Sequence, residues 1–319
     1  MQKILILGAG PSGMAAAAEL HRGGERFTLI EKTGEVGGFS KTYQFGEFRT
    51  DNGPHRFFSK NKYLYGFIED LLGEQWVKVT RCTRFYIQGN FFKYPIELGD
   101  TLKNIGFLKA VKAVFDFVAA KIISYRKKPK NFEEYAVSTF GRTIARLNML
   151  NYTEKIWGLP CTQLSVDWAD QRIKDLSVWS ILKNFVVRKD KPKTLVDEFY
   201  YPDLGTGLIY EAMKRRIEKE NEIQLNVEPV NIIHAVGIIQ EIRFSNGTIC
   251  FPNKVISSIP ITTFIRLLHP LPSDDVLEAV KKLKYRSQVY LFITINKPHI
   301  TRDQWIYFPD KEIPFGRIS

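Results

Sequence analysis

The chain opens with two short apolar runs, and a cluster of glycines follows each of them. Residues 4–7 are apolar and end at Gly8, and small residues with helical spacing follow over 14–20. A second apolar run at 27–30 ends at Glu31, with further glycines close behind. This order of strand, glycine loop, helix and strand predicts the beginning of a parallel α/β unit that binds a dinucleotide.

A similar pattern returns after residue 204. The amphipathic stretch 204–220 predicts a helix, and Asn246-Gly247 between apolar residues predicts a hairpin turn. Further strands are expected at 223–227, 230–233, 254–260, 285–295 and 305–308. A region of another kind therefore separates two stretches of nucleotide-domain character.

The intervening residues 95–195 have long helical patterns, many aromatic residues and several lysine-rich patches. One helical pattern, over 105–128, sets apolar side chains on one face and basic side chains on the other. Its apolar face contains Ile105, Leu108, Val111, Val114, Phe115, Val118 and Ile122. We expect this helix to pack on a core with its lysines in solvent, and a helix lying on a membrane surface is the alternative.

Composition narrows the class of protein. A chain of 319 residues with 44% hydrophobic and 25% charged residues is long enough for two globular domains. The net charge of +12 favours an anionic partner, either a phosphorylated ligand or a membrane surface, and no nucleic-acid-binding module is recognised. Three scattered cysteines and five histidines lack metal-site spacing, so we expect no metal and a reducing, cytoplasmic location, with peripheral membrane contact as the alternative.

The first glycine motif, Gly8-Ala9-Gly10-Pro11-Ser12-Gly13, has the spacing that a bound pyrophosphate requires. Gly8 permits a sharp turn after the strand, Gly10 leaves room for a phosphate, and Gly13 lets the helix approach the sheet. The N–H groups at the start of that helix attract an anion, and Ser12 can add a hydroxyl donor. This motif predicts the phosphate end of a dinucleotide site.

Glu31 ends the second predicted strand, 23 residues beyond Gly8. A carboxylate at this place can accept both ribose hydroxyls of an adenosine and repels a 2′-phosphate, which disfavours NADP. The alternative is an ordinary tight turn with a surface glutamate whose hydrogen bonds are satisfied locally. The full order of elements favours the cofactor site over this alternative.

Taken together, these segments resemble the flavin amine oxidase superfamily, which includes protoporphyrinogen oxidases, phytoene-type desaturases, monoamine oxidases and, more distantly, UDP-galactopyranose mutases. The resemblance runs along essentially the whole chain in sequence order. It implies an α/β fold in which a Rossmann-like (GR2-type) FAD-binding domain, 1–75 and 200–262, is interleaved with a mixed α+β substrate domain, 76–199 and 263–319. Members continue beyond this point through a C-terminal segment that contacts the flavin, so the substrate domain is expected to be incomplete at its C-terminus.

The resemblance implies FAD as the cofactor and assigns residues to it. Gly8, Gly10, Pro11, Ser12, Gly13, Glu31 and Lys32 look like the half of the site that binds ADP. The second glycine motif contributes Gly37, Gly38, Phe39 and Ser40, and Lys41 stands near the place where many members have an arginine. Gly53, Pro54 and His55 resemble the segment beside the flavin ring, and the backbone of Val230 matches the position that holds the adenine.

His55 is the candidate catalytic residue, because its counterpart in UDP-galactopyranose mutases also follows that glycine. The alternative is a loop histidine that is hydrogen-bonded near the cofactor without a chemical role. Tyr94, Trp157 and Tyr201 are candidate walls of a substrate pocket, with aromatic core packing as their alternative. Arg56 is the fourth candidate residue of this pocket.

Three functions remain open. The first is an FAD-dependent oxidoreductase that passes a hydride from an organic substrate to flavin N5. The second is a flavin-dependent isomerase of nucleotide sugars, similar to UDP-galactopyranose mutase, with Arg56, Arg84 and Arg172 holding the diphosphate. The third is a fragment of an FAD domain without activity of its own.

Overall fold

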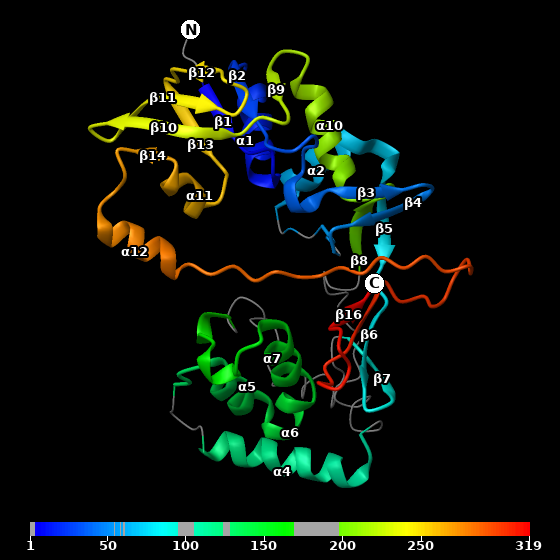
Figure 1. Cartoon of the computed structure of the whole chain (residues 1–319). Helices are drawn as coiled ribbons and strands as arrows, with labels where there is room; N and C mark the ends of the chain where they lie inside the picture. The colour runs from blue at the N-terminus through cyan, green and yellow to red at the C-terminus, as the bar shows by residue number, and fades with distance from the viewer. Residues whose placement is uncertain are drawn as a thin grey trace. The chain divides into compact units, whose positions relative to one another are not determined.

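The computed structural model describes residues 4–53, 55–57, 59, 61–94, 105–123, 128–168 and 198–319 (Figure 1). The chain divides into two compact units, each built from two separate segments. The first unit combines Met1–Val79 with Phe199–Thr294, and the second combines Thr80–Glu198 with Ile295–Ser319. The first unit thus extends to Thr294, beyond the predicted domain boundary at residue 262.

A parallel sheet forms the centre of the first unit. Its strands lie in the order β13 (Lys254–Ser257), β1 (Ile4–Leu7), β2 (Phe27–Ile30) and β9 (Glu222–Gln224). β1 pairs in parallel with both neighbours, so that Leu5 lies opposite Thr28 on one side and Val255 on the other. All four residues of β1 are buried, which explains why the first strand is a continuous apolar run. The predicted Rossmann-like unit is confirmed.

Helices cover one face of this sheet and pack against one another. They are α1 (Pro11–Arg22), α2 (Lys62–Leu72) and α10 (Gly207–Ile217). Their core combines the strand residues Ile6 and Leu29 with Met14 of α1, Ile68 of α2 and Ile217 of α10. Residues far apart in sequence thus share one core, and α1 is fixed at the carboxyl end of β1.

A second sheet in this unit lies against the other side of the parallel sheet. Its order is β12 (Ile249–Cys250), β11 (Ile238–Phe244), β10 (Pro229–Ala235) and β14 (Leu268–His269). Leu7 and Ile30 of the parallel sheet share a buried cluster with Ile232 and Ile242 of this second sheet. The amide of Gly247 donates to the carbonyl of Phe244 at 3.0 Å, so the predicted hairpin turn is confirmed.

Smaller elements complete the first unit. They are the hairpin of β3 (Thr42–Phe45) and β4 (Phe48–Asp51), the paired strands β5 (Trp76–Thr80) and β8 (Glu198–Pro202), the short helices η1 (Gly38–Ser40) and η2 (Gly73–Gln75), and α11 (Ile261–Arg266) and α12 (Asp274–Lys282). The β3–β4 hairpin follows the second glycine motif directly and ends at Asp51.

The second unit consists of a small sheet and a group of helices. The sheet has the order β16 (Arg317–Ile318), β15 (Trp305–Tyr307), β6 (Thr83–Ile87) and β7 (Asn90–Lys93). The helices are α4 (Phe107–Ile123), α5 (Phe132–Phe140), α6 (Arg142–Ile144), the π-helix η3 (Ala145–Leu150), α7 (Asn151–Trp157) and η4 (Cys161–Gln163). β15 confirms the strand predicted at 305–308.

Two expectations from periodicity are wrong. The segment 285–295 is extended but forms no strand, and every residue from 281 to 302 is exposed. Alternating residues form a strand only where a neighbouring strand receives their backbone hydrogen bonds, and no described strand pairs with this segment. α4 is a helix as predicted, but its large apolar side chains face solvent: Leu108 is 83% exposed and Phe115 is 72% exposed. Within the described parts of the chain, no helix combines the length and the hydrophobicity that a membrane crossing needs.

Candidate functional site

The two glycine motifs meet backbone to backbone in the first unit. The amide of Gly37 donates to the carbonyl of Ala9 at 2.8 Å. A Cβ on Gly38 would lie 3.0 Å from Cα of Gly10, so a side chain there would force the two loops apart. Gly37 has φ = +101°, which other residues rarely adopt. Two motifs separated in sequence by β2 therefore form one loop pair.

Within the first motif the glycines do different work. A Cβ on Gly13 would stand 1.9 Å from the carbonyl oxygen of Gly8, so only glycine allows α1 to lie this close to the loop. Gly8 itself has φ = +96°. A Cβ on Gly10 would meet no atom within 4 Å. Gly10 thus faces open space at the start of α1, where the sequence predicts a phosphate.

The N-terminus of α1 points its amides into the same region. Gly10 is the N-cap and gives the helix no side-chain cap, and Pro11 occupies the first turn. The first backbone bond of the helix runs from the amide of Met14 to the carbonyl of Gly10 at 2.9 Å. The amides of Ser12 and Gly13 precede that bond, and such amides with the helix dipole attract an anion.

Glu31 is buried, with 8% of its surface exposed, and it holds the first loop in place. One carboxylate oxygen accepts the amide of Ala9 at 2.8 Å. The other accepts the amide of Thr33 at 2.9 Å and its hydroxyl at 2.8 Å. A carboxylate has about four acceptor sites, so these bonds leave about one for a ligand. The sequence missed this internal role, and the contact of Glu31 with both ribose hydroxyls stays a prediction.

The residues after the second glycine pair are arranged unevenly. Phe39 is 83% exposed, whereas Ser40 is buried and shares a hydrogen bond with Tyr210. Lys41 donates to the hydroxyl of Thr33 at 3.0 Å and lies 3.9 Å from the carboxylate of Glu35. The cation expected near the phosphates is therefore already held by two partners. Lys32, next to Glu31, is exposed.

Val230 lies at an irregularity of β10. The pairing with β11 passes from Pro229 opposite Phe244 to Asn231 opposite Arg243, and it skips Val230. The backbone of a skipped residue is not used by the ladder, which suits the predicted contact with an adenine. The amide of Val227 donates to the carbonyl of Glu31 at 3.0 Å, so this stretch is tied to the ADP half of the predicted site.

The segment expected beside the flavin ring turns sharply at Gly53, where φ = +89°. A Cβ on Gly53 would stand 2.8 Å from the hydroxyl of Tyr290, which places that ring against the turn. The imidazole Nε2 of His55 lies 3.0 Å from the carbonyl of Asn52, a bond that the alternative for His55 expects. Pro54 lies outside the described residues. Tyr290 was missed, because only its position in space brings it to this loop.

Asp51 connects the loops around this turn through hydrogen bonds. Its carboxylate accepts hydrogen bonds from the hydroxyls of Thr42, Tyr201 and Thr206 and from the amide of Thr206, the last at 3.1 Å. A Cβ on Gly205 would collide with Thr42, since it would lie 2.3 Å from the Thr42 hydroxyl. Burial and the hydrogen bond to Asp51 raise the pKa of Tyr201 well above its ordinary value. Tyr201 is thus an anchor of the β4 end, a role that the aromatic pattern did not reveal.

The remaining pocket candidates are distributed over both units. Tyr94 and Trp157 belong to the second unit, whereas Tyr201 and the exposed Arg56 belong to the first. The ring of Tyr94 packs on Phe85 at 5.4 Å, and Trp157 meets Trp168 edge to face at 5.0 Å. Both contacts are aromatic packing of the kind that the alternative predicts.

Of the arginines proposed to bind a diphosphate, Arg84 is engaged by a carboxylate of the chain itself. The guanidinium of Arg84 forms a salt bridge with Asp303, with Nε 2.9 Å and Nη2 2.5 Å from its carboxylate oxygens. Because this buried carboxylate engages two nitrogens of Arg84, the side chain is not available as a dedicated diphosphate ligand. Arg172 lies outside the described residues.

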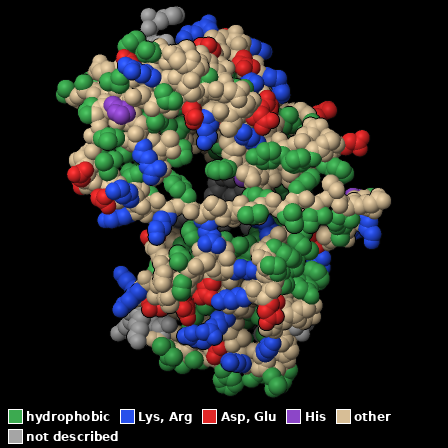
Figure 2. Space-filling view, in the orientation of Figure 1, with side chains coloured by type: hydrophobic (Ala, Val, Ile, Leu, Met, Phe, Trp, Pro, Cys, Tyr) green, Lys and Arg blue, Asp and Glu red, His purple; other side chains and the backbone are tan. Residues whose placement is uncertain are grey.

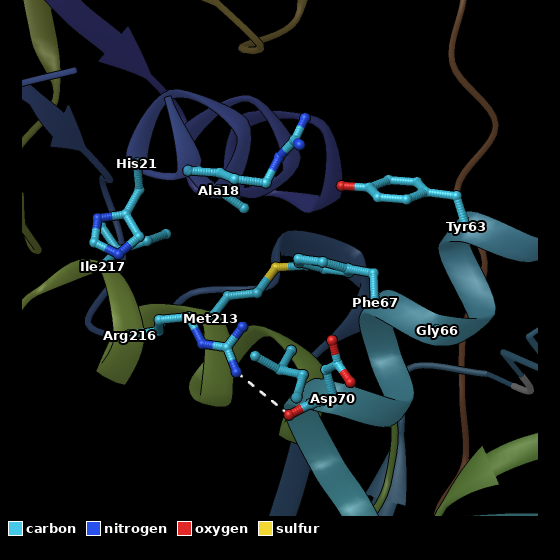
Figure 3. Close-up of a pocket in the computed structure, with 11 residues that line it drawn as sticks. Ala18, His21, Tyr63, Gly66, Phe67, Asp70, Met213, Arg216 and Ile217 are labelled. Carbon is cyan, nitrogen blue, oxygen red and sulfur yellow. Dashed lines mark hydrogen bonds between the residues drawn. The ribbon is translucent and has the colours of Figure 1, made fainter. Parts of the chain in front are cut away.

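A separate hollow of about 430 Å³ lies where α1, α2 and α10 meet (Figure 3). Phe67 and Met213 line it, and Arg216 closes one side by donating to the carbonyl of Asp70 at 3.3 Å. Ala18 and His21 contribute from the C-terminal half of α1. The glycine motifs lie at the other end of that helix, so this hollow is distinct from the dinucleotide site.

Comparison with known proteins supports the dinucleotide site. A model of the NAD(P)-binding Rossmann-like domain matches residues 6–71. A probable UDP-galactopyranose mutase from Klebsiella pneumoniae is 26% identical over 235 residues, which cover 72% of this chain and 57% of the relative. Phytoene desaturase from Fusarium fujikuroi is 22% identical over 86% of this chain and 52% of its own length. This chain therefore spans about half the length of these curated relatives.

A solved structure matches almost all of the fold. The crystal structure of reduced UDP-galactopyranose mutase superposes with a TM-score of 0.82 and 25% identity, covering 99% of this chain and 69% of that one. These matches support the expected cofactor, FAD, and the open space beside Gly10 lies where a phosphate of this group is expected. They confirm the similarity of the chain to the FAD-dependent amine oxidase superfamily, to which the mutases and phytoene desaturases belong.

Proposed function

We propose that this chain binds FAD along its paired glycine motifs and acts as an FAD-dependent oxidoreductase. The observation that carries the proposal is the contact of Gly37 and Gly38 with Ala9 and Gly10 around open space at the N-terminus of α1. In this role the amides of α1 bind the diphosphate.

The ADP half would be held by Glu31 through its remaining acceptor site and by the backbone of Val230. Lys32 lies beside Glu31 on the surface and adds positive charge there. The diphosphate would meet Gly37, Gly38 and the η1 turn. Each of these roles is a proposal that rests on the geometry above.

FAD, when bound, supplies an acceptor for a hydride from an organic substrate. The chain contributes position and proton control. Asp51 fixes the end of β4, and this places the turn at Gly53 and the imidazole of His55. Because Nε2 of His55 faces the carbonyl of Asn52, that nitrogen carries the proton and Nδ1 is left as an acceptor. His55 can then hold a proton at Nδ1 during substrate oxidation.

A second candidate function is a flavin-dependent isomerase of nucleotide sugars. The superposition over 99% of the chain on UDP-galactopyranose mutase favours it, as does the net charge of +12. Arg84 weakens it, since its guanidinium is bound to Asp303. Arg56 remains a candidate for the diphosphate of such a substrate.

The proposed FAD domain is 1–75 and 200–262, and the proposed substrate domain is 76–199 and 263–319, of which residues 263–294 lie in the same compact unit as the FAD domain. A reducing, cytoplasmic setting is part of the proposal and is supported by the free thiols of Cys82, Cys161 and Cys250. An FAD-domain fragment without activity of its own is the third possibility; it would hold a nucleotide or nothing, and it predicts no turnover.

The test begins with the purified chain incubated with FAD. Uptake of FAD with a flavin absorbance spectrum supports cofactor binding, and no uptake refutes it. Anaerobic bleaching of that spectrum by amine or polycyclic donors supports the oxidoreductase. A rise in melting temperature with UDP or a UDP-sugar, without bleaching by any donor, supports the isomerase. If no donor bleaches the spectrum and no UDP compound gives a response, the third possibility remains, a fragment without activity.

A further inference from the structure

The helix α4 is built the opposite way from an ordinary surface helix. Its buried residues are the small Ala113 and Ala120, whereas Phe107 and Leu108 are 80% and 83% exposed. Spacings of three and four residues join the exposed apolar side chains into one stripe along the helix. The stripe consists of Leu108, Val111, Phe115, Val118 and Ile122. From Leu108 to Ile122 it runs for about 21 Å.

Contacts within the second unit fix this orientation. Asp116 accepts hydrogen bonds from the amide and the hydroxyl of Thr143, at 3.0 and 2.6 Å. A Cβ on Gly141 would lie 2.7 Å from the amide nitrogen of Phe117, so α4 packs closely on the loop before α6. Turning the stripe inward would break the Asp116 bonds and push large side chains into this contact. The outward direction of the stripe is therefore part of the fold.

Basic side chains border the stripe. At 100° per residue, Lys112 and Lys121 fall at its two edges, and both are exposed. Lys109 lies beyond Lys112, and Asp116, the one acidic residue of α4, faces Thr143 instead of solvent. Figure 2 shows hydrophobic and basic side chains side by side at the lower edge of the view, where Figure 1 draws α4. Apolar residues edged with lysines are typical of a helix that lies in the interface of an anionic membrane.

We propose that α4 docks on the surface of an anionic lipid bilayer, with the stripe in the acyl region and the lysines at the headgroups. The net charge favours an anionic bilayer over a second copy of the chain as the surface that covers the stripe. Two molecules that each carry a net charge of +12 repel, whereas an anionic leaflet attracts the same charge. α4 has the length and the lysines of a helix lying on the membrane, not of one crossing it. This inference does not depend on the proposed function.

Co-sedimentation with lipid vesicles tests the proposal. The full chain is mixed with phosphatidylcholine vesicles that contain about 30 mol% phosphatidylserine, and separately with phosphatidylcholine alone. We expect binding to the anionic vesicles that weakens at least about tenfold in about 0.5 M salt or without phosphatidylserine. Phe115→Asp should weaken binding at least about tenfold, because it places a charge in the middle of the stripe.

Val236→Asp is the matched control. Val236 is fully exposed in the β10–β11 turn, so it makes the same charge change away from α4 and should change vesicle affinity less than about twofold. Circular dichroism melting should show both variants folded, since both side chains lie mostly in solvent. No sedimentation with anionic vesicles, or an equal loss in Val236→Asp, overturns the proposal. Dimerisation that Phe115→Asp abolishes, without vesicle binding, overturns it in favour of a second copy.

Discussion

Exchanging single glycines for alanine should separate the packing role of the first glycine motif from its binding role. In Gly13→Ala the new Cβ would stand 1.9 Å from the carbonyl oxygen of Gly8 and 2.7 Å from the hydroxyl of Ser258. Cβ contacts under 3.0 Å are essentially never seen, so α1 must move away from the loop by about 1 Å. Such overpacking costs about 1–3 kcal/mol, and the better helix propensity of alanine returns about 0.5–1 kcal/mol.

The net loss in Gly13→Ala is about 1–2 kcal/mol of unfolding free energy. For the first unit, which falls in the size range of about 150–250 residues, that corresponds to a fall in melting temperature of about 2–8 °C. Gly10→Ala is the matched variant, because its Cβ meets no atom within 4 Å and φ is −69°, a value that alanine adopts freely. Its melting temperature should change by less than about 2 °C, since only the N-cap preference is affected.

For FAD affinity the ranking of the two variants should be reversed: Gly10→Ala, the more stable of the two, should bind FAD more weakly than Gly13→Ala. In Gly10→Ala the methyl group occupies the space expected for the diphosphate, so we expect FAD affinity to fall at least about tenfold, or about 1.4 kcal/mol. Differential scanning fluorimetry gives the melting temperatures, and quenching of FAD fluorescence gives the affinities. A Gly13→Ala variant as stable as the native chain would contradict the packing role of Gly13, and a Gly10→Ala variant that binds FAD as tightly as the native chain would contradict the binding role of Gly10.

Three further predictions concern stability and reactivity. Tyr201→Phe should lower the unfolding free energy by about 1.5–3 kcal/mol in urea denaturation, since it removes a hydrogen bond to the Asp51 carboxylate; an unchanged midpoint would contradict this role. Burial opposes ionisation of Asp303, but hydrogen bonds from Arg84 and others outweigh burial and lower the pKa of this carboxyl below 3.8. The contribution of Asp303 to the unfolding free energy is therefore present above pH 3.8 and is lost as the pH falls through the lowered pKa. Asp303→Asn should cost about 2 kcal/mol at pH 7 and should flatten the acid limb of a stability–pH curve, and equal acid sensitivity of both proteins would refute it. Burial raises the pKa of Cys161 to about 12, so mass spectrometry should find its thiol unlabelled by iodoacetamide at about pH 8 until the chain unfolds, and labelling of the folded protein would show an open site.

Local spacing was enough to predict the start of the fold. The strand, the glycine loop, α1 and β2 depend on residues close in sequence, and Gly13 was assigned to close packing for the reason that the structure shows. The partners of Glu31 could not be predicted in this way. Its bonds to Ala9 and Thr33 depend on how the loop folds back over the end of β2, and a carboxylate at a strand end is equally compatible with a ligand.

Periodicity was less informative where contacts with the rest of the chain decide which face of a helix is buried and whether a segment pairs as a strand. The pattern of α4 gave the helix and its apolar stripe, but it could not tell which face the rest of the chain covers. Small residues Ala113 and Ala120 allow closer packing than the large ones, and Asp116 fixes the helix through Thr143. The segment 285–295 alternates like a strand, yet a strand needs a neighbour for its backbone, and sequence alternation does not supply one.

The site expected beside the flavin also depends on contacts between distant segments. Asp51, Tyr201 and Thr206 meet only after β4, β8 and the start of α10 have been brought together. Asp51 does stand directly before the Asn-Gly turn, and Thr206 stands between two glycines, so both could have been suspected from local sequence. Tyr290 had no such signal.

Equilibrium titration of the purified chain with FAD, followed by fluorescence quenching, decides whether the paired glycine motifs bind this cofactor. We expect saturable binding of one FAD per chain, competition by ADP, and much weaker binding of NADP⁺, whose 2′-phosphate would approach the buried carboxylate of Glu31. Absence of saturable FAD binding, or NADP⁺ binding as tight as that of FAD, would contradict this expectation.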